Sequence, residues 1–255
     1  MVDIKTHIAT FDATSITVRG KDLVRDLIGH RSFTEMLYFL ACNRFPTPTE
    51  TQVLDACLVT LMEHGFNRST LITRLTQDSV PGQPQVAMAA GLLAVGDVFV
   101  GTIEDCARIL RRGLEEGGDP DAYCRRVVAE LRASQKAVPG FGHPHHSPDD
   151  PRTMRLLEVA EAAGVSGVHV ELLRRLSLAL DENRGHHVTI NATGGIAALL
   201  LEIGVPVDAM RCFAVVSRAG GLVGHVIEER QSHSARLICE LARTHIPYED
   251  PETTR

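Results

Sequence analysis

The chain has 255 residues, of which 44% are hydrophobic and 23% are charged, and its formal net charge is −6. This composition is ordinary for a globular chain long enough to bury a full core. No basic run exceeds a pair and Trp is absent, so we do not expect nucleic acid as a partner. We expect no membrane partner either, because no uninterrupted apolar run has the length of a span and the N-terminus lacks an apolar signal core. Six cysteines without paired spacing predict reduced thiols in a cytoplasmic protein.

The elements are predicted in chain order from apolar periodicity. Residues 6–20 alternate and favour a short strand or extended arm, and residues 21–27 favour a short helix. Ser32 and Glu35 form a capping box before a helix over 33–42. Further helices are predicted at 49–63, 70–76, 85–94, up to Leu114, at 121–133, 151–163, 166–181, around 197–201, and from Val207 to near Glu229. The fold class is therefore all-α, with around ten to twelve helices and at most a marginal N-terminal β element.

The loop from Val138 to Arg152 carries the most unusual composition. It contains four prolines, which exclude a regular helix or central strand, and the glycines Gly140 and Gly142, which permit positive φ or close approach. Its three histidines follow within four residues. We expect no metal there, because no cysteine and no helical His-x-x-His pattern completes a ligand set. A plain surface loop, with Arg152 at the start of the next helix, is the simplest alternative.

Three further positions have ordinary structural interpretations. His64 precedes Gly65 near the end of a helix, where an imidazole interacts favourably with the helix dipole. Thr193 lies in a short extended piece that enters an apolar helix. Arg218 lies in an apolar helix, where a guanidinium is costly unless it meets an internal acid such as Glu202 or a substrate carboxylate.

The loop motif resembles one known family. Val-Pro-Gly-Phe-Gly-His, with an arginine nine residues after the histidine, is similar to the substrate loop of the citrate synthase superfamily. The resemblance implies that His143 polarises the keto oxygen of oxaloacetate and that Arg152 binds a carboxylate, a role that suits its planar fork. Similar motifs imply keto-acid binding by His64 and Arg218, and, more loosely, by Arg236 across a dimer interface.

The resemblance also implies a ligand and an assembly. Main chain of Pro139, Gly140, Phe141 and Gly142 would receive the adenine of CoA or an acyl-CoA, which acts as a substrate, and no metal would be needed. The partners would be a di- or tricarboxylate, a CoA thioester and a second copy of the chain, in a homodimer or higher homo-oligomer. The length matches a short form of the citryl-CoA lyase type, as in the C-terminal module of ATP-citrate lyase. We expect residues 1–255 to form a single citrate synthase-like unit, with a possible small subdomain around 100–210.

Two positions depart from the family pattern. Phe99 stands where the family has a catalytic histidine, and Thr193 stands where it has the aspartate that removes the α-proton of acetyl-CoA. A hydroxyl without a base cannot abstract that proton at neutral pH. His143 could serve as a base for the substrate hydroxyl, and His187, Asp97 or Glu104 could supply the missing proton. Three hypotheses remain: a citryl-CoA lyase-like enzyme that uses a non-standard acid–base set with Thr193 in its site, a CoA-independent lyase or decarboxylase of a small polycarboxylate, or a non-catalytic dicarboxylate-binding subunit.

Overall fold

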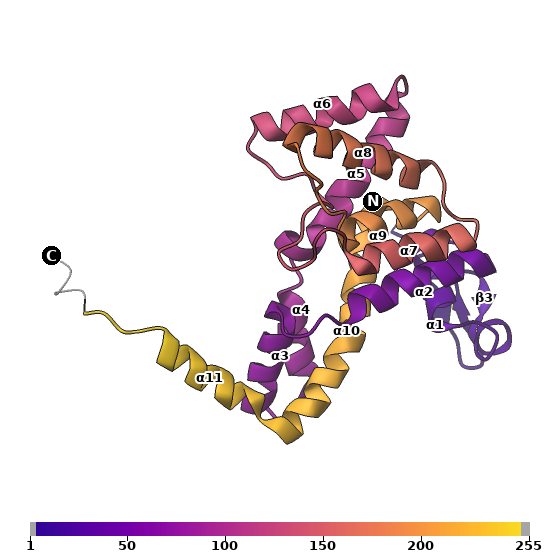
Figure 1. Ribbon diagram of the computed structural model, residues 1–255. Helices are drawn as coiled ribbons and strands as arrows, with labels where there is room; N and C mark the ends of the chain where they lie inside the picture. Colours follow the sequence, from indigo (N-terminus) through magenta and orange to yellow (C-terminus); the bar gives the residue numbers. More distant parts are fainter. Residues whose placement is uncertain (1–3, 251–255) are drawn as a thin grey trace. The chain divides into compact units, whose positions relative to one another are not determined.

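The computed structural model describes residues 4–250, apart from the side chains of Val98 and Phe99. These residues form eleven α-helices, two single-turn π-helices and one small antiparallel sheet (Figure 1), so the all-α prediction is confirmed. The chain divides into two compact units. The first comprises Met1–Thr60 with Val100–Phe213, and the second comprises Leu61–Phe99 with Ala214–Arg255. The residues predicted as a subdomain around 100–210 fall within the first unit.

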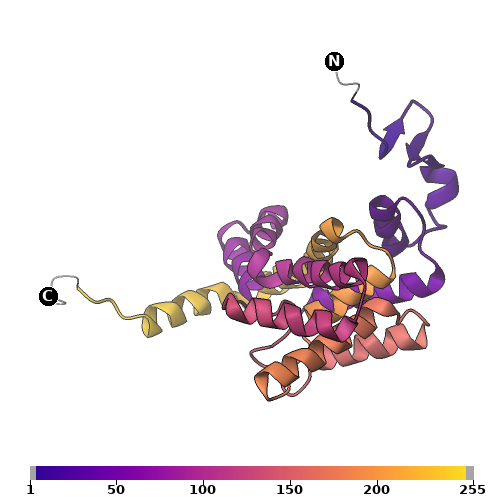
Figure 2. The same cartoon turned by 90° about the horizontal axis from the view of Figure 1, so that it is seen from above.

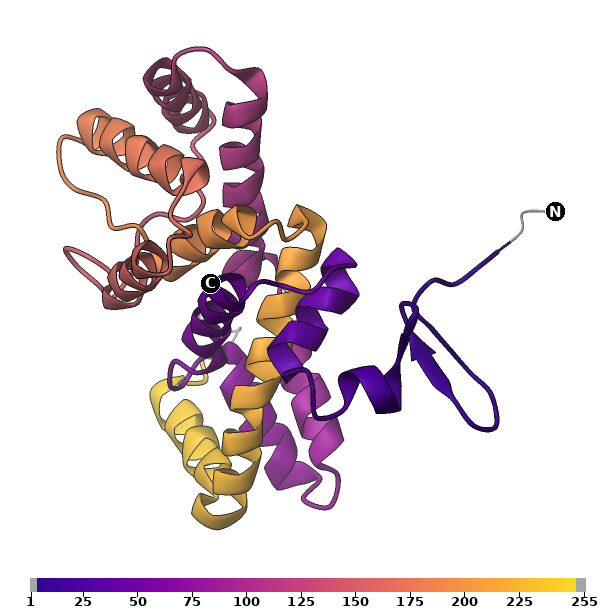
Figure 3. The same cartoon turned by 90° about the vertical axis from the view of Figure 1, so that its right-hand side faces the viewer.

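The N-terminal β element is a three-stranded antiparallel sheet (Figure 3), formed by β1 (Ala9–Phe11), β2 (Ile16–Val18) and β3 (Lys21–Asp22). The helix predicted from Lys21 begins later, as η1 (Leu23–Leu27), because Lys21 and Asp22 pair with β2. The Asp22 carboxylate then caps this turn by accepting hydrogen bonds from the N–H groups of Val24 and Arg25. The capping box of Ser32 and Glu35 is confirmed at the start of α1 (Phe33–Cys42).

The core of the first unit is built around α9 (Ala192–Glu202). Its residues 196–199 are completely buried, and α5, α7 and α8 all pack against it (Figures 1 and 2). Such a helix carries apolar residues all round, because every face meets another helix. The three helices that pack on α9 are α5 (Thr102–Glu116), α7 (Pro151–Ala162) and α8 (Val168–Arg184), and α6 (Pro120–Ala133) packs on α8. Earlier in the chain, α2 (Pro48–Met62) follows α1.

Glu202, at the end of α9, holds the start of α8. Its Oε1 accepts hydrogen bonds from the backbone N–H groups of Gly167, His169 and Val170, at 3.0, 2.8 and 3.0 Å. A helix N-terminus leaves these donors without intrahelical partners, and a carboxylate satisfies them well. Glu202 is therefore used within the first unit; an acid that lies near Arg218 within the second unit is Glu63, whose Oε2 is 4.0 Å from Nη1 of Arg218.

The second unit contains α3 (Arg68–Ser79), α4 (Pro84–Leu93), most of α10 (Val207–Ser232) and α11 (Ser234–His245), while η2 (Asp97–Gly101) spans its boundary. α3 begins at Arg68, before the predicted Thr70, because Asn67 caps it; Ser69 and Thr70 lie inside the helix. α3 and α4 pack closely at Gly91, where an added Cβ would lie 1.9 Å from Oγ1 of Thr73. α11 was not predicted from the sequence.

α10 has 26 residues and is, by length and composition alone, long and apolar enough to cross a membrane. The search for uninterrupted apolar runs did not find it, because charged residues such as Arg211 and Arg218 lie within it. A core helix of a globular protein passes the same test, so this property is weak support for a membrane role.

Candidate active site

The loop before α7 is held against the segment that precedes α9. Phe141 forms an antiparallel bridge with Ile190, and the N–H of Gly142 donates to the carbonyl of Thr189 at 2.8 Å. Gly140 has a φ of +87°, and a Cβ at this position would lie 2.8 Å from Cα of Gly194. Gly140 is therefore required by its backbone conformation and by close packing inside the protein.

Arg152, in the first turn of α7, is fixed by its own N-cap residue. The Asp150 side chain is completely buried and accepts hydrogen bonds from Nε of Arg152 at 3.0 Å and from its Nη2 at 2.7 Å. Asp150 also accepts the backbone N–H of Ala192, which ties the arginine to the start of α9. Burial alone would raise the pKa of Asp150, but the hydrogen bonds and charge of Arg152 outweigh it and lower that pKa.

His143 has a defined tautomer. Its Nδ1 accepts hydrogen bonds from the backbone N–H groups of His145 and His146, at 3.1 and 3.0 Å. An atom that accepts these bonds carries a lone pair, so the ring proton lies on Nε2. The ring of His146 stacks on that of His143 with centroids 4.2 Å apart, which restricts its rotation. His143 therefore presents a hydrogen-bond donor at Nε2.

The donors of His143 and Arg152 converge. Nη2 of Arg152 lies 3.3 Å from Nε2 of His143, while its other hydrogen is directed to Asp150. Two N–H donors do not satisfy each other, but an oxygen that accepts from both does. Nη1 of Arg152 has no hydrogen-bond partner within residues 4–250. This arrangement suits a keto oxygen or carboxylate of a small acid.

Thr193, in the first turn of α9, belongs to a chain of neutral groups. Its hydroxyl donates to Oδ1 of Asn191 at 2.7 Å and accepts from the hydroxyl of Thr102 at 3.0 Å. Asn191 is also the N-cap of α9, and its Nδ2 donates to the carbonyl of Gly142 at 2.8 Å. The position therefore lies beside the loop, and it offers no base.

The four residues predicted to receive CoA are only partly accessible. Gly140 and Phe141 are buried, Pro139 is half-buried and Gly142 is exposed. The Gly142 N–H and the carbonyls of Gly140 and Gly142 already form hydrogen bonds within the protein. Three main-chain groups that a purine could otherwise meet are therefore already in use.

The sequence suggested three proton donors, and two of them are held in ion pairs. Nδ1 of His187 lies 2.7 Å from Oδ2 of Asp181 and its Nε2 lies 3.2 Å from Oδ1 of Asp149, and these hydrogen bonds raise the pKa of His187. Glu104 is buried and its Oε2 accepts from Arg211 at 2.9 Å. Asp97 is exposed in η2. The side chain of Phe99 lies outside the described residues.

The second unit places His64 and Arg218 on either side of one carboxylate. Oε1 of Glu63 accepts the backbone N–H of His64 at 2.8 Å, and its Oε2 lies 4.0 Å from Nη1 of Arg218. Gly221 makes this possible, because an added Cβ would lie 2.0 Å from the carbonyl of Met62. α10 can thus approach the end of α2 only where it lacks a side chain.

Arg236 lies in α11, in the second unit. Its Nε is 3.3 Å from Oδ1 of Asp78 on α3, and 70% of its side chain is exposed. Its predicted role across a dimer interface stays a prediction.

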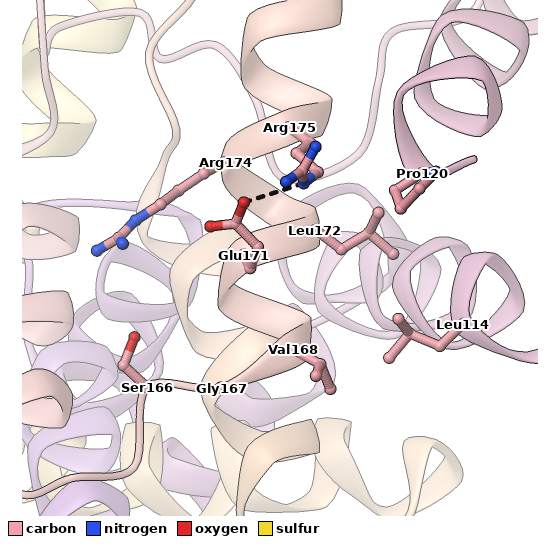
Figure 4. Close-up of a pocket in the computed structure, with 9 residues that line it drawn as sticks. All are labelled: Leu114, Pro120, Ser166, Gly167, Val168, Glu171, Leu172, Arg174 and Arg175. Atoms are coloured by element: carbon pink, nitrogen blue, oxygen red, sulfur yellow. Dashed lines mark ion pairs between the residues drawn. The ribbon is translucent and has the colours of Figure 1, made fainter. Parts of the chain in front are cut away.

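A separate pocket of about 500 Å³ lies in the first unit, between the end of α5 and the starts of α6 and α8 (Figure 4). None of the predicted site residues lines it. Glu171 and Arg175 form an ion pair at its edge, with Nε of Arg175 2.9 Å from Oε1 of Glu171.

Comparison with known proteins decides the family. A family model described as the C-terminal domain of citrate synthase matches residues 32–241. The chain belongs to the citrate synthase family. The citrate synthase of Haloferax volcanii is 28% identical over 228 residues, which cover 88% of this chain and 58% of that protein. The citrate synthase of a Synechocystis strain is 28% identical over 203 residues, which cover 77% of this chain and 49% of that protein. The chain thus spans about half the length of the curated relatives it matches.

Solved structures of the family share this fold. The citryl-CoA lyase from Hydrogenobacter thermophilus superposes with a TM-score of 0.82 and 29% identity, over 90% of this chain and 88% of that one. A Methanosaeta concilii ATP citrate lyase mutant in complex with (3S)-citryl-CoA gives a TM-score of 0.80 at 20% identity, over 98% of this chain and 42% of that one. The second match shows the fold alone. The family resemblance inferred from the loop motif is confirmed.

Sequence reasoning missed the residues that support the predicted site. Asp150 orients Arg152, and Glu63 accepts a hydrogen bond from the backbone N–H of His64. His225 in turn donates a hydrogen bond to Glu63. Each lies within two residues of a predicted ligand or within the motif that contains it. An acid directly before a histidine or before Pro-Arg was therefore a usable signal.

Proposed function

We propose that the chain is a citryl-CoA lyase-like enzyme of the citrate synthase family. It would cleave or form a 3-hydroxy-polycarboxyl-CoA, with oxaloacetate or a related 2-oxo acid and a short acyl-CoA as the other partners. The carrying observation is that Nε2 of His143 lies 3.3 Å from Nη2 of Arg152, while the buried carboxylate of Asp150 holds that guanidinium in place. The likeness to the Hydrogenobacter thermophilus citryl-CoA lyase, which extends over most of both chains, supports the same reaction class.

The two donors suit the oxygen side of that reaction. In the cleavage direction, the tertiary hydroxyl gives up its proton to solvent water, negative charge develops on its oxygen, and the oxygen becomes a keto group as the adjacent carbon–carbon bond breaks. An N–H donor fixed in the Nε2 tautomer stabilises this charge without having to reorganise. The same donor polarises the keto oxygen in the reverse direction. The tautomer favours this role for His143 over the role of general base.

The site is less well equipped for the thioester half of the reaction. The departing acyl group leaves as an enolate, which must take a proton, and Thr193 offers only a hydroxyl that already donates to Asn191. Loss of a general acid or base commonly costs a factor of roughly 10² to 10⁴ in rate. We therefore propose that cleavage of citryl-CoA is slow, and that the natural substrate needs less acid–base assistance at the departing enolate. The neutral chain at Thr193 equally favours the dicarboxylate-binding alternative.

Assembly and location belong to the same proposal. We propose a homodimer and a cytoplasmic location, and the location agrees with six cysteines that form no disulfide within the described residues.

The test is calorimetric titration of oxaloacetate, citrate and CoA separately, with a citryl-CoA cleavage assay. Arg152→Ala is compared with Arg155→Ala, whose arginine lies on the same helix and is 74% exposed. Binding of both CoA and an acid, with acid binding lost only in Arg152→Ala, supports the proposal. Binding of an acid without CoA points to a CoA-independent enzyme or a dicarboxylate-binding subunit. Binding of neither overturns all three.

A further inference from the structure

A buried arginine on α3 organises the charges of the second unit. Arg74 has only 3% of its side chain exposed, and Nη1 donates to Glu229 at 3.2 Å and to the hydroxyl of Ser234 at 3.1 Å, while Nη2 pairs with Glu228. Glu229 also accepts the N–H of Ala235, so it caps α11. These bonds join α3 to α10 and to the start of α11. A guanidinium so deeply buried needs such partners.

The Nε–H group of Arg74 bonds to an imidazole instead of a carboxylate. Its Nε donates to Nδ1 of His225 at 2.8 Å. A guanidinium has no acceptor, so Nδ1 of His225 must carry a lone pair and Nε2 must carry the proton. Nε2 then donates to Oε2 of Glu63 at 3.0 Å. Arg74 thus sets the tautomer of His225, and His225 directs one donor at Glu63.

Glu63 connects this chain to the two predicted ligands of the unit. One of its oxygens accepts from His225 and lies 4.0 Å from Arg218, and the other accepts the backbone N–H of His64. Burial alone would raise the pKa of Glu63, but the bonds from His225 and from the backbone lower it. The carboxylate is therefore held in its charged form beside both residues.

We propose that His225 is a positioning residue for 2-oxo acid binding: through Glu63 it fixes the backbone at His64 and keeps a carboxylate 4.0 Å from Nη1 of Arg218. This rests on the proposed function, in which His64 and Arg218 bind the acid. The bond from His225 to Glu63 is not needed to join α3, α10 and α11, because Glu228, Glu229 and Ser234 already do so.

The experiment compares three variants in the full chain. His225→Ala removes both bonds, whereas His225→Gln keeps an acceptor for Arg74 and a donor for Glu63. Glu228→Gln is the matched control, because it weakens an ion pair of the same arginine without touching Glu63. We expect His225→Ala to raise the Kd or KM for oxaloacetate about tenfold or more with a smaller change in kcat. His225→Gln and Glu228→Gln stay near wild type, although Glu228→Gln melts at a lower temperature.

A second readout needs no ligand. The backbone amide proton of His64, observed by NMR, should shift in His225→Ala and return toward its wild-type position in His225→Gln. An unchanged amide in His225→Ala overturns the positioning role, whatever the protein binds. If the amide shifts in His225→Ala but the wild-type protein binds no 2-oxo acid, the positioning of His64 is supported and the proposed function is overturned. Equal losses of acid binding in His225→Ala and Glu228→Gln would reduce the effect to stability and overturn the inference.

Discussion

Asp150 holds Arg152 because its carboxylate accepts two hydrogen bonds, one from Nε at 3.0 Å and one from Nη2 at 2.7 Å. The acid comes two residues before the arginine and also caps the helix that carries it. A long, flexible side chain is thereby fixed before any ligand arrives, so binding loses less conformational entropy.

Asp150→Asn should therefore weaken both stability and acid binding. The buried amide cannot match the charge of Arg152, and we expect a loss of about 2–3 kcal/mol in the free energy of unfolding, below the value for a fully buried pair because Arg152 is partly exposed. Urea unfolding and oxaloacetate titration measure the two effects. Asp149→Asn is the control, since Asp149 is half-exposed and pairs with His187 instead of Arg152. Equal effects of the two variants would contradict the assigned role.

Asp150 also predicts a dependence of stability on pH. Its folded pKa is lowered from the ordinary 3.8, so its contribution is complete above pH 3.8 and is lost as the pH falls through the lowered folded pKa. Wild type should lose stability in this acid range more steeply than Asp150→Asn, as measured by thermal melting between pH 5 and the acid limit of folding. Parallel curves would show that the carboxylate is not linked to folding.

His187 predicts the opposite dependence. Hydrogen bonds to Asp181 and Asp149 raise its pKa above 6.5, so its contribution is complete below pH 6.5 and is lost as the pH rises through the raised folded value. In His187→Gln, the melting temperature should depend less on pH in this range. NMR titration of the imidazole in wild type provides the direct check, and an imidazole that titrates at or below 6.5 would refute the ion pairs.

The two loop glycines should differ in their tolerance of alanine. Gly142 has a φ of +78° with open space at its Cβ position, so Gly142→Ala should cost only about 1–2 kcal/mol of backbone strain. Gly140→Ala adds a clash with the backbone of Gly194 and should cost at least about 3 kcal/mol. Urea unfolding separates them. A larger loss at Gly142 would mean that the loop packs differently.

Thr193 allows a gain-of-function test. Thr193→Asp with Phe99→His restores the family's acid–base pair, and the hydroxyl of Thr102 can donate to the new carboxylate. We expect citryl-CoA cleavage to rise by at least about a hundredfold. Thr193→Val is the control that removes the hydroxyl without adding a base, and it should leave the rate low. Wild-type turnover already at ordinary rates, of order 1 to 10³ per second, would show that another residue does this work.

Local signals in the sequence were sufficient for most of the fold. The capping box at Ser32, the prolines before Thr49 and Asp121 and the apolar stripes between them predicted helices whose observed ends differ by a few residues. Such features act within one or two turns, so a linear pattern contains them. The missed α11 has no side-chain cap from its own N-cap residue, and the N–H of its second residue, Ala235, is satisfied by Glu229 on another helix.

The candidate site also has one part that the sequence predicts and another that only the structure shows. The sequence by itself determined which residue types are present: the loop histidine and arginine, the family to which they point, and a threonine where an acid was expected. Only the tertiary structure decided that Asp150 orients Arg152, that backbone amides place the proton of His143 on Nε2, and that Arg74 acts on Glu63 through His225. Each of these depends on hydrogen-bond direction. A sequence lists donors and acceptors, but folding alone selects which of them meet.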